Sequence, residues 1–291
     1  MALKVFILGG TGLIGSGVIR ELVGHGHVVT ALSRSPASDD RLRALGACPV
    51  RGDMREPDGW RGHLNSEDAV VHVAATFGDD MGAVDAAVID ALERVAPGRT
   101  EPLKVVYTGG CWLYGATGDE IADEGRPFAP IPAFAWMVEH ARRLMANREL
   151  RTAVVHPAIV YAKGLGGFEH FIAAARKGEP IPVWGAPATR WPLVHQEDLA
   201  VAYRLALETR VRGHYNASAE IGVPVERIVA EIARRTGSSA GFTVRSAGDV
   251  IAEHGSWALG PMLDQQMTSA KLREAVDWNP TYADFAETEL I

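Results

Sequence analysis

Three glycines near the start of the chain have a spacing that suits the binding of phosphate groups. An apolar run that begins at Val5 leads directly into the segment Gly9-Gly-Thr-Gly-Leu-Ile-Gly15. A glycine at the turn permits a tight bend, Gly12 lets the backbone approach a pyrophosphate, and Gly15 lets a following helix pack closely on the strand. The first N–H groups of that helix then offer a partial positive charge to the phosphates. The pattern therefore predicts a dinucleotide-binding turn.

Two registers of this turn fit the spacing, one that starts at Gly9 and one that starts at Gly10. The alternative interpretation is a glycine-rich turn in another kind of α/β protein. A second apolar strand, 27–32, follows at the expected distance and favours the dinucleotide interpretation. The residues predicted to touch the cofactor at the turn are Gly9, Thr11, Gly12, Leu13, Ile14 and Gly15.

The end of the second strand indicates which dinucleotide is bound. An acidic side chain there would bind the ribose hydroxyls of NAD and repel a 2′-phosphate. This chain instead has Ser33 and Arg34, and a hydroxyl beside a guanidinium suits a phosphate monoester. We therefore predict that NADP(H) is preferred over NAD(H). The alternative for Arg34 is a solvated loop arginine.

Composition excludes several classes of function. The chain has 291 residues, 47% of them hydrophobic, so it can bury a large core. Its net charge of −7 and the lack of a basic run argue against nucleic acid as a partner. Only two cysteines occur, Cys48 and Cys111, so a reducing cytoplasm is the expected compartment. No apolar segment approaches the roughly 20 residues that span a bilayer, so no membrane association is expected. No metal site is predicted.

Short apolar runs alternate with helical stretches over the first part of the chain. Near-continuous apolar strands separated by helices are typical of a parallel sheet covered on both faces. The sequence therefore predicts an α/β fold, a doubly wound parallel sheet of the Rossmann type with a smaller C-terminal substrate-binding lobe. The predicted strands are Val5–Leu8, Val28–Leu32, Cys48–Val50, Ala69–Val73, Val105–Thr108 and Thr152–His156, and the predicted helices are Gly15–Val23, Asp39–Leu45, Met81–Val95 and Ala133–Asn147.

Gly- and Pro-rich loops, which include Trp184 and Trp191, become frequent in the second part of the chain. We predict a dinucleotide-binding core over residues 1–160 and a mostly substrate-binding lobe over residues 161–291, with residues from about 190 to 217 returning to the core. The predicted elements of this part are the helix Asp198–Leu207, the strand His214–Ala217, the helix Val223–Thr236 with a left-handed cap at Gly237, the strand Phe242–Arg245 and the helix Ser269–Val276.

Several longer motifs follow one another at the predicted strand ends and beyond them. They are Gly9-Gly-Thr-Gly-Leu-Ile-Gly15, Arg51-Gly-Asp53-Met54, Val71-His-Val-Ala-Ala75, Leu113-Tyr114-Gly115, His156-Pro-Ala-Ile-Val-Tyr161, Trp191-Pro-Leu-Val-His195-Gln-Glu-Asp198-Leu-Ala and Asp264-Gln-Gln-Met-Thr-Ser-Ala-Lys271. Together they resemble the extended short-chain dehydrogenase/reductase superfamily, in particular its NAD-dependent epimerase/dehydratase group. The likeness runs over nearly the whole chain.

The resemblance implies further cofactor contacts. By this likeness Asp53 would bond the adenine, Ala74 and Ala75 would line the ribose, and residues 157–160 would lie against the nicotinamide. The cofactor residues that the resemblance and the strand ends add are Asp53, Met54, Val73, Ala74, Ala75, Thr108, Pro157, Ala158 and Val160.

The proton relay of the family is absent from this chain. In the family a tyrosine hydroxyl gives or takes the substrate proton, a lysine four residues later lowers its pKa, and a serine or threonine holds the substrate oxygen. Here Gly110 falls at the hydroxyl position, and Phe134 and Val138 fall at the tyrosine and lysine positions. The resemblance therefore implies the fold and the cofactor but not the reaction.

Three side chains are candidates for the missing chemistry. Thr108 ends a strand beside the expected nicotinamide, although it would also suit a bond to the cofactor ribose. Tyr114 carries a phenol near the site but packs structurally in the family. His140 carries an imidazole, a group suited to act as an acid near neutral pH, although a surface histidine is the alternative. Cys111 is expected to be a small buried hydrophobe.

Aromatic residues are frequent on segments that should surround the nicotinamide. An aromatic-lined pocket favours an apolar or aromatic substrate over a nucleotide sugar. The alternative is that several of these side chains belong to the core. The residues predicted to bind substrate are Trp112, Trp136, Tyr161 and Trp191.

The leading hypothesis is an NADP(H)-dependent oxidoreductase that reduces a carbonyl or imine of a small substrate. The alternatives are a non-catalytic NADP(H)-binding regulator and a redox-neutral isomerase, epimerase or lyase. The partner is then a small molecule. A homodimer through helices 81–95 and 133–147 is also predicted, because the first carries an apolar stripe. The same stripe would equally serve packing on the sheet.

Overall fold

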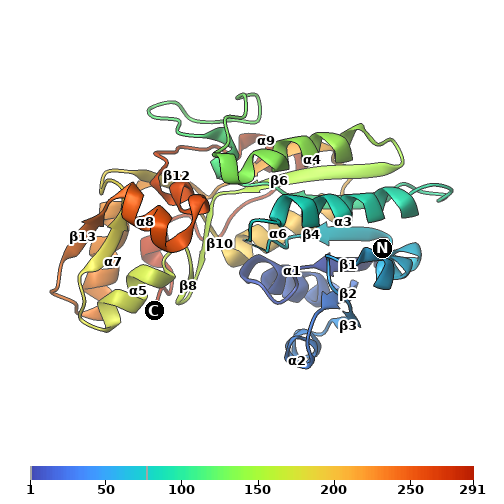
Figure 1. Cartoon of the computed structure of the whole chain (residues 1–291), viewed down its shortest axis with the longest axis horizontal. Helices are drawn as coiled ribbons and strands as arrows, with labels where there is room; N and C mark the ends of the chain where they lie inside the picture. The colour runs from blue at the N-terminus through green and yellow to red at the C-terminus, as the bar shows by residue number, and fades with distance from the viewer. Residues whose placement is uncertain (1, 77) are drawn as a thin grey trace.

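A computed structural model describes residues 2–76 and 78–291 and contains a large sheet domain beside a smaller lobe (Figure 1). The strands of the large sheet are β1 (Lys4–Leu8), β2 (Val28–Ser33), β3 (Cys48–Arg51), β4 (Ala69–His72), β5 (Leu103–Thr108), β6 (Leu150–Pro157) and β11 (Gly213–Ala217). They are all parallel, in the order β11-β6-β5-β4-β1-β2-β3. Because the chain starts in the middle and winds outward in both directions, the predicted doubly wound sheet is confirmed.

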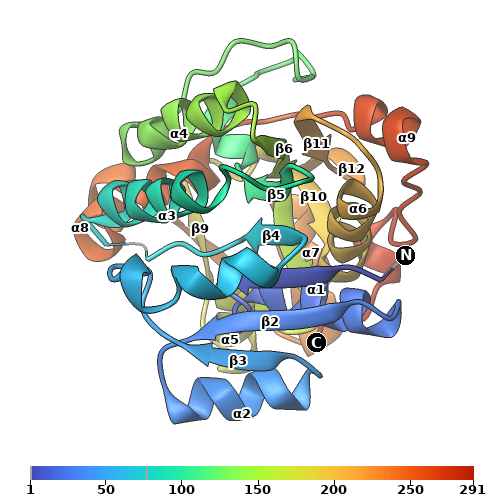
Figure 2. The ribbon, with the colours of Figure 1, turned by 90° about the vertical axis from the view of Figure 1, so that its right-hand side faces the viewer.

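Helices cover both faces of this sheet (Figure 2). They are α1 (Leu13–Gly24), α2 (Pro36–Ala44), α3 (Met81–Val95), α4 (Ala135–Ala146), α6 (Gln196–Glu208) and α9 (Ala270–Val276), with short 3-10 helices η1 (Pro57–Gly59), η2 (Arg61–Ser66), η3 (Cys111–Tyr114) and η4 (Pro132–Phe134). α1 packs on α6 at one face, and α3 packs on α4 at the other. None of the helices in the described ranges is both long enough and apolar enough to cross a membrane.

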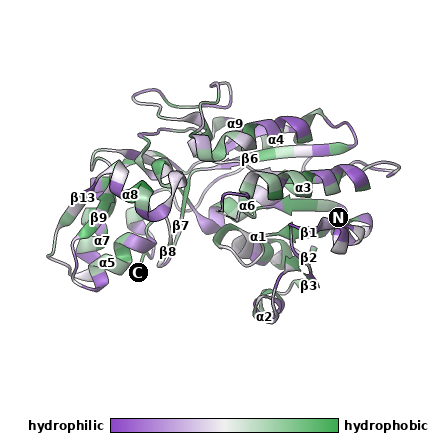
Figure 3. Ribbon diagram, viewed as in Figure 1, coloured by the Kyte–Doolittle hydropathy of each residue, from purple (hydrophilic) through white to green (hydrophobic). Residues whose placement is uncertain are grey.

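Alternating side chains of the strands supply two cores, one on each face of the sheet. Val5 and Ile7 lie in a buried cluster with residues of α1 and α6, whereas Phe6 and Leu8 lie in a cluster with residues of α3 and α4. Figure 3 shows the strands of the sheet in hydrophobic colours, while α2 at the edge is largely hydrophilic. This two-sided burial explains why the strands are continuous apolar runs in the sequence.

The apolar stripe of α3 faces the sheet. Val88 and Leu92 lie in the same buried cluster as Phe6 of β1. Where α3 meets α4, farther from the sheet, an ion pair joins Arg143 to Asp90 at 2.6 Å. The stripe therefore serves packing within the chain, and the homodimer through these helices stays a prediction.

The smaller lobe is built from two further sheets. Its strands are β7 (Ile159–Ala162), β8 (Leu165–Gly166), β9 (Ile181–Trp184), β10 (Arg190–His195), β12 (Glu220–Pro224) and β13 (Phe242–Arg245), and its helices are α5 (Glu169–Arg176), α7 (Val225–Thr236), α8 (Ala247–His254), η5 (Ser256–Met262) and η6 (Phe285–Glu287). One sheet has the order β12-β10-β7-β8, and the other pairs β13 with β9. α7 ends at Gly237 with φ of 70°, as the predicted left-handed cap requires.

Strands β9 and β10 lie where the sequence predicts loops, and this prediction is wrong. Each strand contains a proline, Pro182 or Pro192, and proline argues against an interior strand. The pairing of β10 with β12 shifts register between Trp191 and Leu193, which accommodates Pro192. α6 and β11 return to the large sheet, where β11 pairs with β6.

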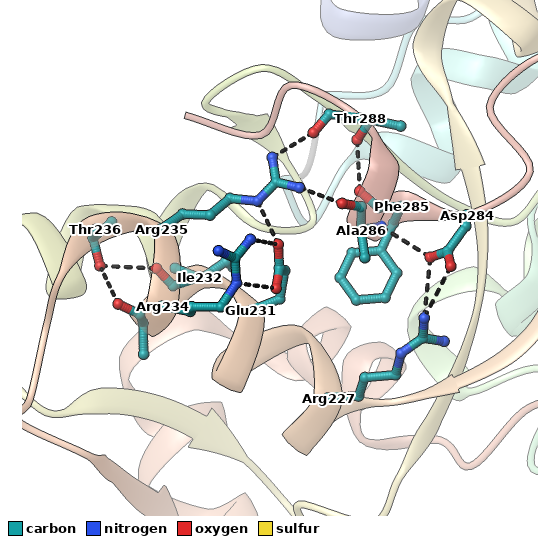
Figure 4. Close-up of polar contacts among 11 residues, drawn as sticks. Arg227, Glu231, Ile232, Arg234, Arg235, Thr236, Asp284, Phe285, Ala286 and Thr288 are labelled. Carbon is teal, nitrogen blue, oxygen red and sulfur yellow. Dashed lines mark hydrogen bonds and ion pairs between the residues drawn. The ribbon is translucent and has the colours of Figure 1, made fainter.

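The C-terminal segment of the chain is fastened to the lobe by polar contacts. Figure 4 shows Arg235 of α7 donating to the backbone oxygens of Ala286 and Thr288, and Arg227 contacting both carboxylate oxygens of Asp284 at 3.1 Å. These contacts place the C-terminal segment beside α7.

Asp198 at the start of α6 holds the same segment from the side of the large domain. Its two carboxylate oxygens accept the N–H groups of Thr281 and Tyr282 at 2.7 and 2.8 Å. The Asp198 motif of the sequence is therefore structural.

Candidate functional site

The glycine turn has the geometry of the register that starts at Gly9. Gly9 has φ of 91°, and a Cβ there would lie 2.8 Å from the backbone nitrogen of Ala74. A Cβ on Gly15 would lie 2.2 Å from the Gly9 oxygen, so the first turn of α1 rests directly on the strand end. Gly10 has no positive φ and instead packs below Ile19. The two registers left open by the sequence are thereby separated.

The turn fits the phosphates of a dinucleotide. Gly12 is the N-cap of α1, and no side chain of the described residues caps the helix, so the N–H groups of its first turn are left for a ligand. Ala74 at the end of β4 closes one side of the turn. Gly166 of β8 approaches the other side, because a Cβ there would lie 2.8 Å from Leu13 Cδ2. The lobe and the large domain therefore meet at the glycine turn.

The end of β2 presents an unpaired cation. Arg34 is exposed and makes no hydrogen bond or ion pair with any residue in 2–76 or 78–291. Ser33 is buried and donates to the backbone oxygen of Ser35 at 3.2 Å. Asp39, the nearby acid of α2, is held by Arg51 at 2.5 Å; a hydrogen bond from Ser33 and the contact with Arg51 lower the pKa of its carboxyl. Arg34 thus offers, at the end of β2, a guanidinium without a carboxylate partner in the described part of the chain.

A small pocket joins the ends of β3 and β4 to the helices above them. It brings the predicted cofactor residues Met54, Ala74 and Ala75 together with Trp136 of α4. Its full lining is Met54, His72, Ala74, Ala75, Thr76, Met81, Val84, Asp85 and Trp136. Asp53 beside it is ordered by the N–H group of Arg55, which its carboxylate accepts at 2.9 Å. The hydroxyl of Thr76 is buried without a partner in the described part of the chain, as expected where a ligand supplies one.

A buried carboxylate, Asp85, is part of the lining of this pocket. Asp85 Oδ1 is 2.9 Å from His72 Nε2, and Asp85 Oδ2 is 2.6 Å from His140 Nδ1 and 3.0 Å from the hydroxyl of Tyr107. Burial alone would raise the pKa of Asp85, but His72 and His140 lower it to about 2. His140 is therefore engaged in joining α4 to α3, and its predicted catalytic role gains no support from this position.

The hydroxyls of Thr108 and Tyr114 are also engaged. Thr108 Oγ1 lies 2.6 Å from the hydroxyl of Tyr203 on α6. Tyr114 donates to Asn216 Oδ1 at 2.7 Å, and burial raises the pKa of its phenol, so it stays protonated at neutral pH. Thr108 keeps a half-buried position at the strand end, whereas Tyr114 is buried. Of the predicted acids, Thr108 alone has both a strand-end position and partial access to solvent.

The ring of His156 fills the space that a side chain at Gly109 would occupy, and it also contacts the backbone of Gly110. A Cβ on Gly109 would lie 2.3 Å from His156 Nδ1, and this nitrogen accepts the N–H group of Gly110 at 3.3 Å. His156 Nε2 lies 2.8 Å from His214 Nδ1. Burial, with the neighbouring His214, lowers the pKa of His156 to about 3. His156 therefore holds the glycine turn as a neutral ring.

This burial predicts a pH effect on stability. Below pH 6.5 the unfolded chain binds a proton at His156 that the folded chain excludes until about pH 3, so stability falls as the pH falls in this range. The stability of wild type relative to His156→Asn should drop by about 1 kcal/mol between pH 6 and pH 5. Urea unfolding at both pH values measures it. His25→Asn, at the exposed end of α1, is the control. An equal drop in the stability of wild type relative to His25→Asn would contradict the prediction.

Aromatic side chains fill the space where the family has its proton relay. The ring of Trp112 lies 5.6 Å from Phe134 and 6.4 Å from Trp257, measured between centroids. Trp136 packs on Gly82 of α3 and donates to the Ala133 oxygen at 2.9 Å. Trp112 and Trp136 thus belong to one half-buried apolar cluster between η3, α4 and the lobe.

Tyr161 and Trp191 lie elsewhere. Tyr161 is buried against Phe168 at 4.9 Å, and Trp191 stacks on Phe171 at 5.7 Å. Both are core residues of the lobe, the alternative that the sequence left open, and their positions do not support the prediction that they bind substrate. Cys111 is buried as expected, and burial raises the pKa of its thiol to about 12. In the described ranges no group of three or more His, Cys, Asp or Glu side chains could hold a metal ion.

Asp85, His156 and Gln265 shape the site but are not among the predicted residues. Asp85 stands on the apolar face of α3 between Val84 and Val88, and an acid in such a stripe is a signal of a paired buried carboxylate. Gln265 donates from Nε2 to the oxygens of Cys111 and Gly115 at 2.8 and 2.7 Å and so holds both ends of η3. For Gln265 nothing but the resemblance of its motif offers a signal.

The doubly wound sheet, the Gly9 turn and the uncapped α1 together define a Rossmann-type protein of the short-chain dehydrogenase/reductase class. Within this class the chain belongs to the NAD dependent epimerase/dehydratase family, whose model matches residues 5–218. The resemblance found in the sequence is thereby confirmed.

Individual relatives are distant. An uncharacterized protein of Schizosaccharomyces pombe, C2A9.02, is 28% identical over 97% of this chain and 96% of its own. A 2-alkyl-3-oxoalkanoate reductase of Stenotrophomonas maltophilia is 26% identical over 72% of this chain and 67% of its own. The crystal structure of a UDP-glucose 4-epimerase from Thermus thermophilus in complex with NAD has a TM-score of 0.79 at 20% identity, covering 99% of this chain and 96% of that one. The last likeness shows the fold alone.

Proposed function

We propose that the protein is an NADP(H)-dependent oxidoreductase that reduces a carbonyl or imine of a small, apolar or aromatic molecule. The observation that carries the proposal is the apolar cluster of Trp112, Phe134 and Trp257 at the relay position, beside a turn built for a dinucleotide. The similarity to a protein named as a reductase of an oxoalkanoate supports reduction. The unpaired Arg34 supports NADP(H).

In a carbonyl reduction a hydride adds to the carbonyl carbon and a proton to its oxygen, giving an alcohol. A bound NADPH, held by the first turn of α1, would supply this hydride. The first turn of α1 holds the phosphates, and the aromatic cluster excludes water and orients the substrate. The proton comes from water or from Thr108, whose contact with Tyr203 fixes the position of its hydroxyl.

The charges around Arg190 at the start of β10 favour an apolar substrate over a nucleotide sugar. Arg190, next to Trp191, contacts Asp264 through two nitrogens at 2.9 and 2.6 Å and Asp119 at 3.0 Å. Two carboxylates already neutralise the charge of this guanidinium and occupy its N–H donors, so it is poorly suited to bind a diphosphate.

The function is tested by following NADPH absorbance while the pure protein is incubated with aromatic and aliphatic aldehydes, ketones and imines. Steady oxidation with one group of substrates would establish a reductase. Tight NADPH binding without oxidation across the panel would contradict it and favour the regulator, which the lost tyrosine and lysine also suit.

The cofactor preference predicts a charge-dependent change in affinity. Arg34→Asp should weaken NADPH binding about a hundredfold and leave NADH binding within about threefold, because a charge-assisted pair to the 2′-phosphate is replaced by repulsion. Titration with both dinucleotides measures the effect. Arg176→Asp on α5 makes the same charge change in the lobe and serves as control. An equal loss for NADPH and NADH would eliminate the 2′-phosphate role.

A further inference from the structure

The indole nitrogen of Trp112 is buried and has no hydrogen-bond acceptor among residues 2–76 and 78–291. Other indoles of this region are paired: Trp136 donates to Ala133 and Trp191 donates to Pro261. A buried donor without a partner loses its hydration and gains nothing in return, so few persist in folded proteins. The exception at Trp112 therefore needs an explanation.

Trp112 lies beside two positions that carry hydroxyl groups in the family. It follows Gly110, which occupies the family's hydroxyl position but has no side chain, by two residues. Its ring contacts Phe134, which occupies the position of the family's tyrosine. Neither Gly110 nor Phe134 can bond a substrate oxygen through its side chain, whereas the neighbouring Trp112 carries an N–H group without an acceptor among residues 2–76 and 78–291.

The lobe covers Trp112 in this structure. A Cβ on Gly260 of η5 would lie 2.3 Å from Trp112 Cδ2, so the η5 backbone rests on the face of the indole. The next residue, Pro261, accepts the indole N–H group of Trp191 at 2.7 Å. η5 thus contacts two indoles: its backbone rests on the ring of Trp112, and it accepts a hydrogen bond from Trp191. The Trp112 nitrogen is shielded from water as long as η5 covers the ring.

We propose that the Trp112 indole N–H group is the hydrogen-bond donor that recognises the oxygen of an apolar carbonyl compound, and that η5 moves to admit it. This inference rests on the proposed function for the identity of the oxygen. The Trp112 N–H group is covered by apolar residues, so it favours a molecule that has both a hydrogen-bond acceptor and apolar surface. Only such a molecule bonds the nitrogen and also replaces the contacts of η5.

The direct test observes the indole N–H resonance of Trp112 by NMR in ¹⁵N-tryptophan-labelled protein saturated with NADP⁺, which supports no reduction. The resonance is assigned by its loss in Trp112→Phe. Acetophenone should move it downfield, as hydrogen bonding does, whereas α-methylstyrene, which has CH₂ in place of the oxygen, should not. A Trp112 resonance unmoved by acetophenone up to its solubility would overturn the proposal.

A matched pair of variants tests the orphaned state. Trp112→Phe and Trp191→Phe remove similar volume, but Trp191→Phe also removes a formed hydrogen bond. Trp191→Phe should lower Tm by about 2 to 4 °C more than Trp112→Phe does. Trp112→Phe should weaken acetophenone binding about tenfold and leave α-methylstyrene binding unchanged. Equal losses of Tm in the two variants, or equal affinities of wild type and Trp112→Phe for acetophenone, would show that the Trp112 nitrogen has no such role.

The outcome separates this inference from the proposed function. Acetophenone binding through Trp112 without NADPH oxidation in the substrate panel would keep the donor role and remove the reductase. NADPH oxidation that survives in Trp112→Phe with an unchanged KM would keep the reductase and remove the donor role.

Discussion

Asp85→Ala is expected to lower the free energy of unfolding by about 3 to 5 kcal/mol, because it removes the shared partner of a buried cluster. His72 and His140 each lie within 3 Å of a carboxylate oxygen, and the Tyr107 hydroxyl donates to the same carboxylate. Without Asp85, the Tyr107 hydroxyl and His140 lose their hydrogen-bond partner, and the buried His72 loses the carboxylate 2.9 Å from its Nε2. Urea unfolding followed by circular dichroism measures the loss.

Asp90→Ala is the matched control, since Asp90 lies on the same helix and is paired with Arg143 at 2.6 Å but is 45% exposed. An exposed pair contributes at most about 1 kcal/mol, so this variant should stay near wild type. A similar small effect for both variants would show that the Asp85 cluster is solvated and does not hold α3 and α4 on the sheet.

Gly15→Ala is expected to weaken NADPH binding by at least about a hundredfold. The new Cβ would lie 2.2 Å from the Gly9 oxygen, a backbone atom that cannot rotate away, so the first turn of α1 must move off the strand end. Two charge-assisted hydrogen bonds to phosphate, at about 1.5 kcal/mol or more each, would then be lost. Equilibrium titration of NADPH measures the change.

Gly24→Ala, at the other end of α1, provides the control. It is exposed, and a Cβ there meets nothing within 4 Å. Alanine should therefore leave binding unchanged and stabilise the helix by up to about 1 kcal/mol. Wild-type affinity in Gly15→Ala with an intact fold would mean that the phosphates bind elsewhere.

The sheet and the cofactor turn could be predicted from the sequence because both produce local sequence patterns. The strands bury both faces, so each appears as an apolar run. Gly15 is required by a contact with the Gly9 oxygen inside one short turn, and Gly9 by its positive φ and its contact with Ala74. The strands β9 and β10 were hidden because a proline interrupts each of them. The missing tyrosine and lysine were equally visible, since their absence is a property of the sequence itself.

Side-chain partners distant in sequence were decided by the tertiary structure. Thr108 meets Tyr203, His140 meets Asp85, and Trp112 meets Gly260 across segments that the sheet and the lobe bring together. Residue type gives a hydroxyl, an imidazole or an indole the capacity to donate or accept. Which partner each group bonds depends on how elements distant in sequence pack together. The sequence therefore determined the fold and the cofactor turn, while the tertiary structure decided which polar groups are left for a substrate.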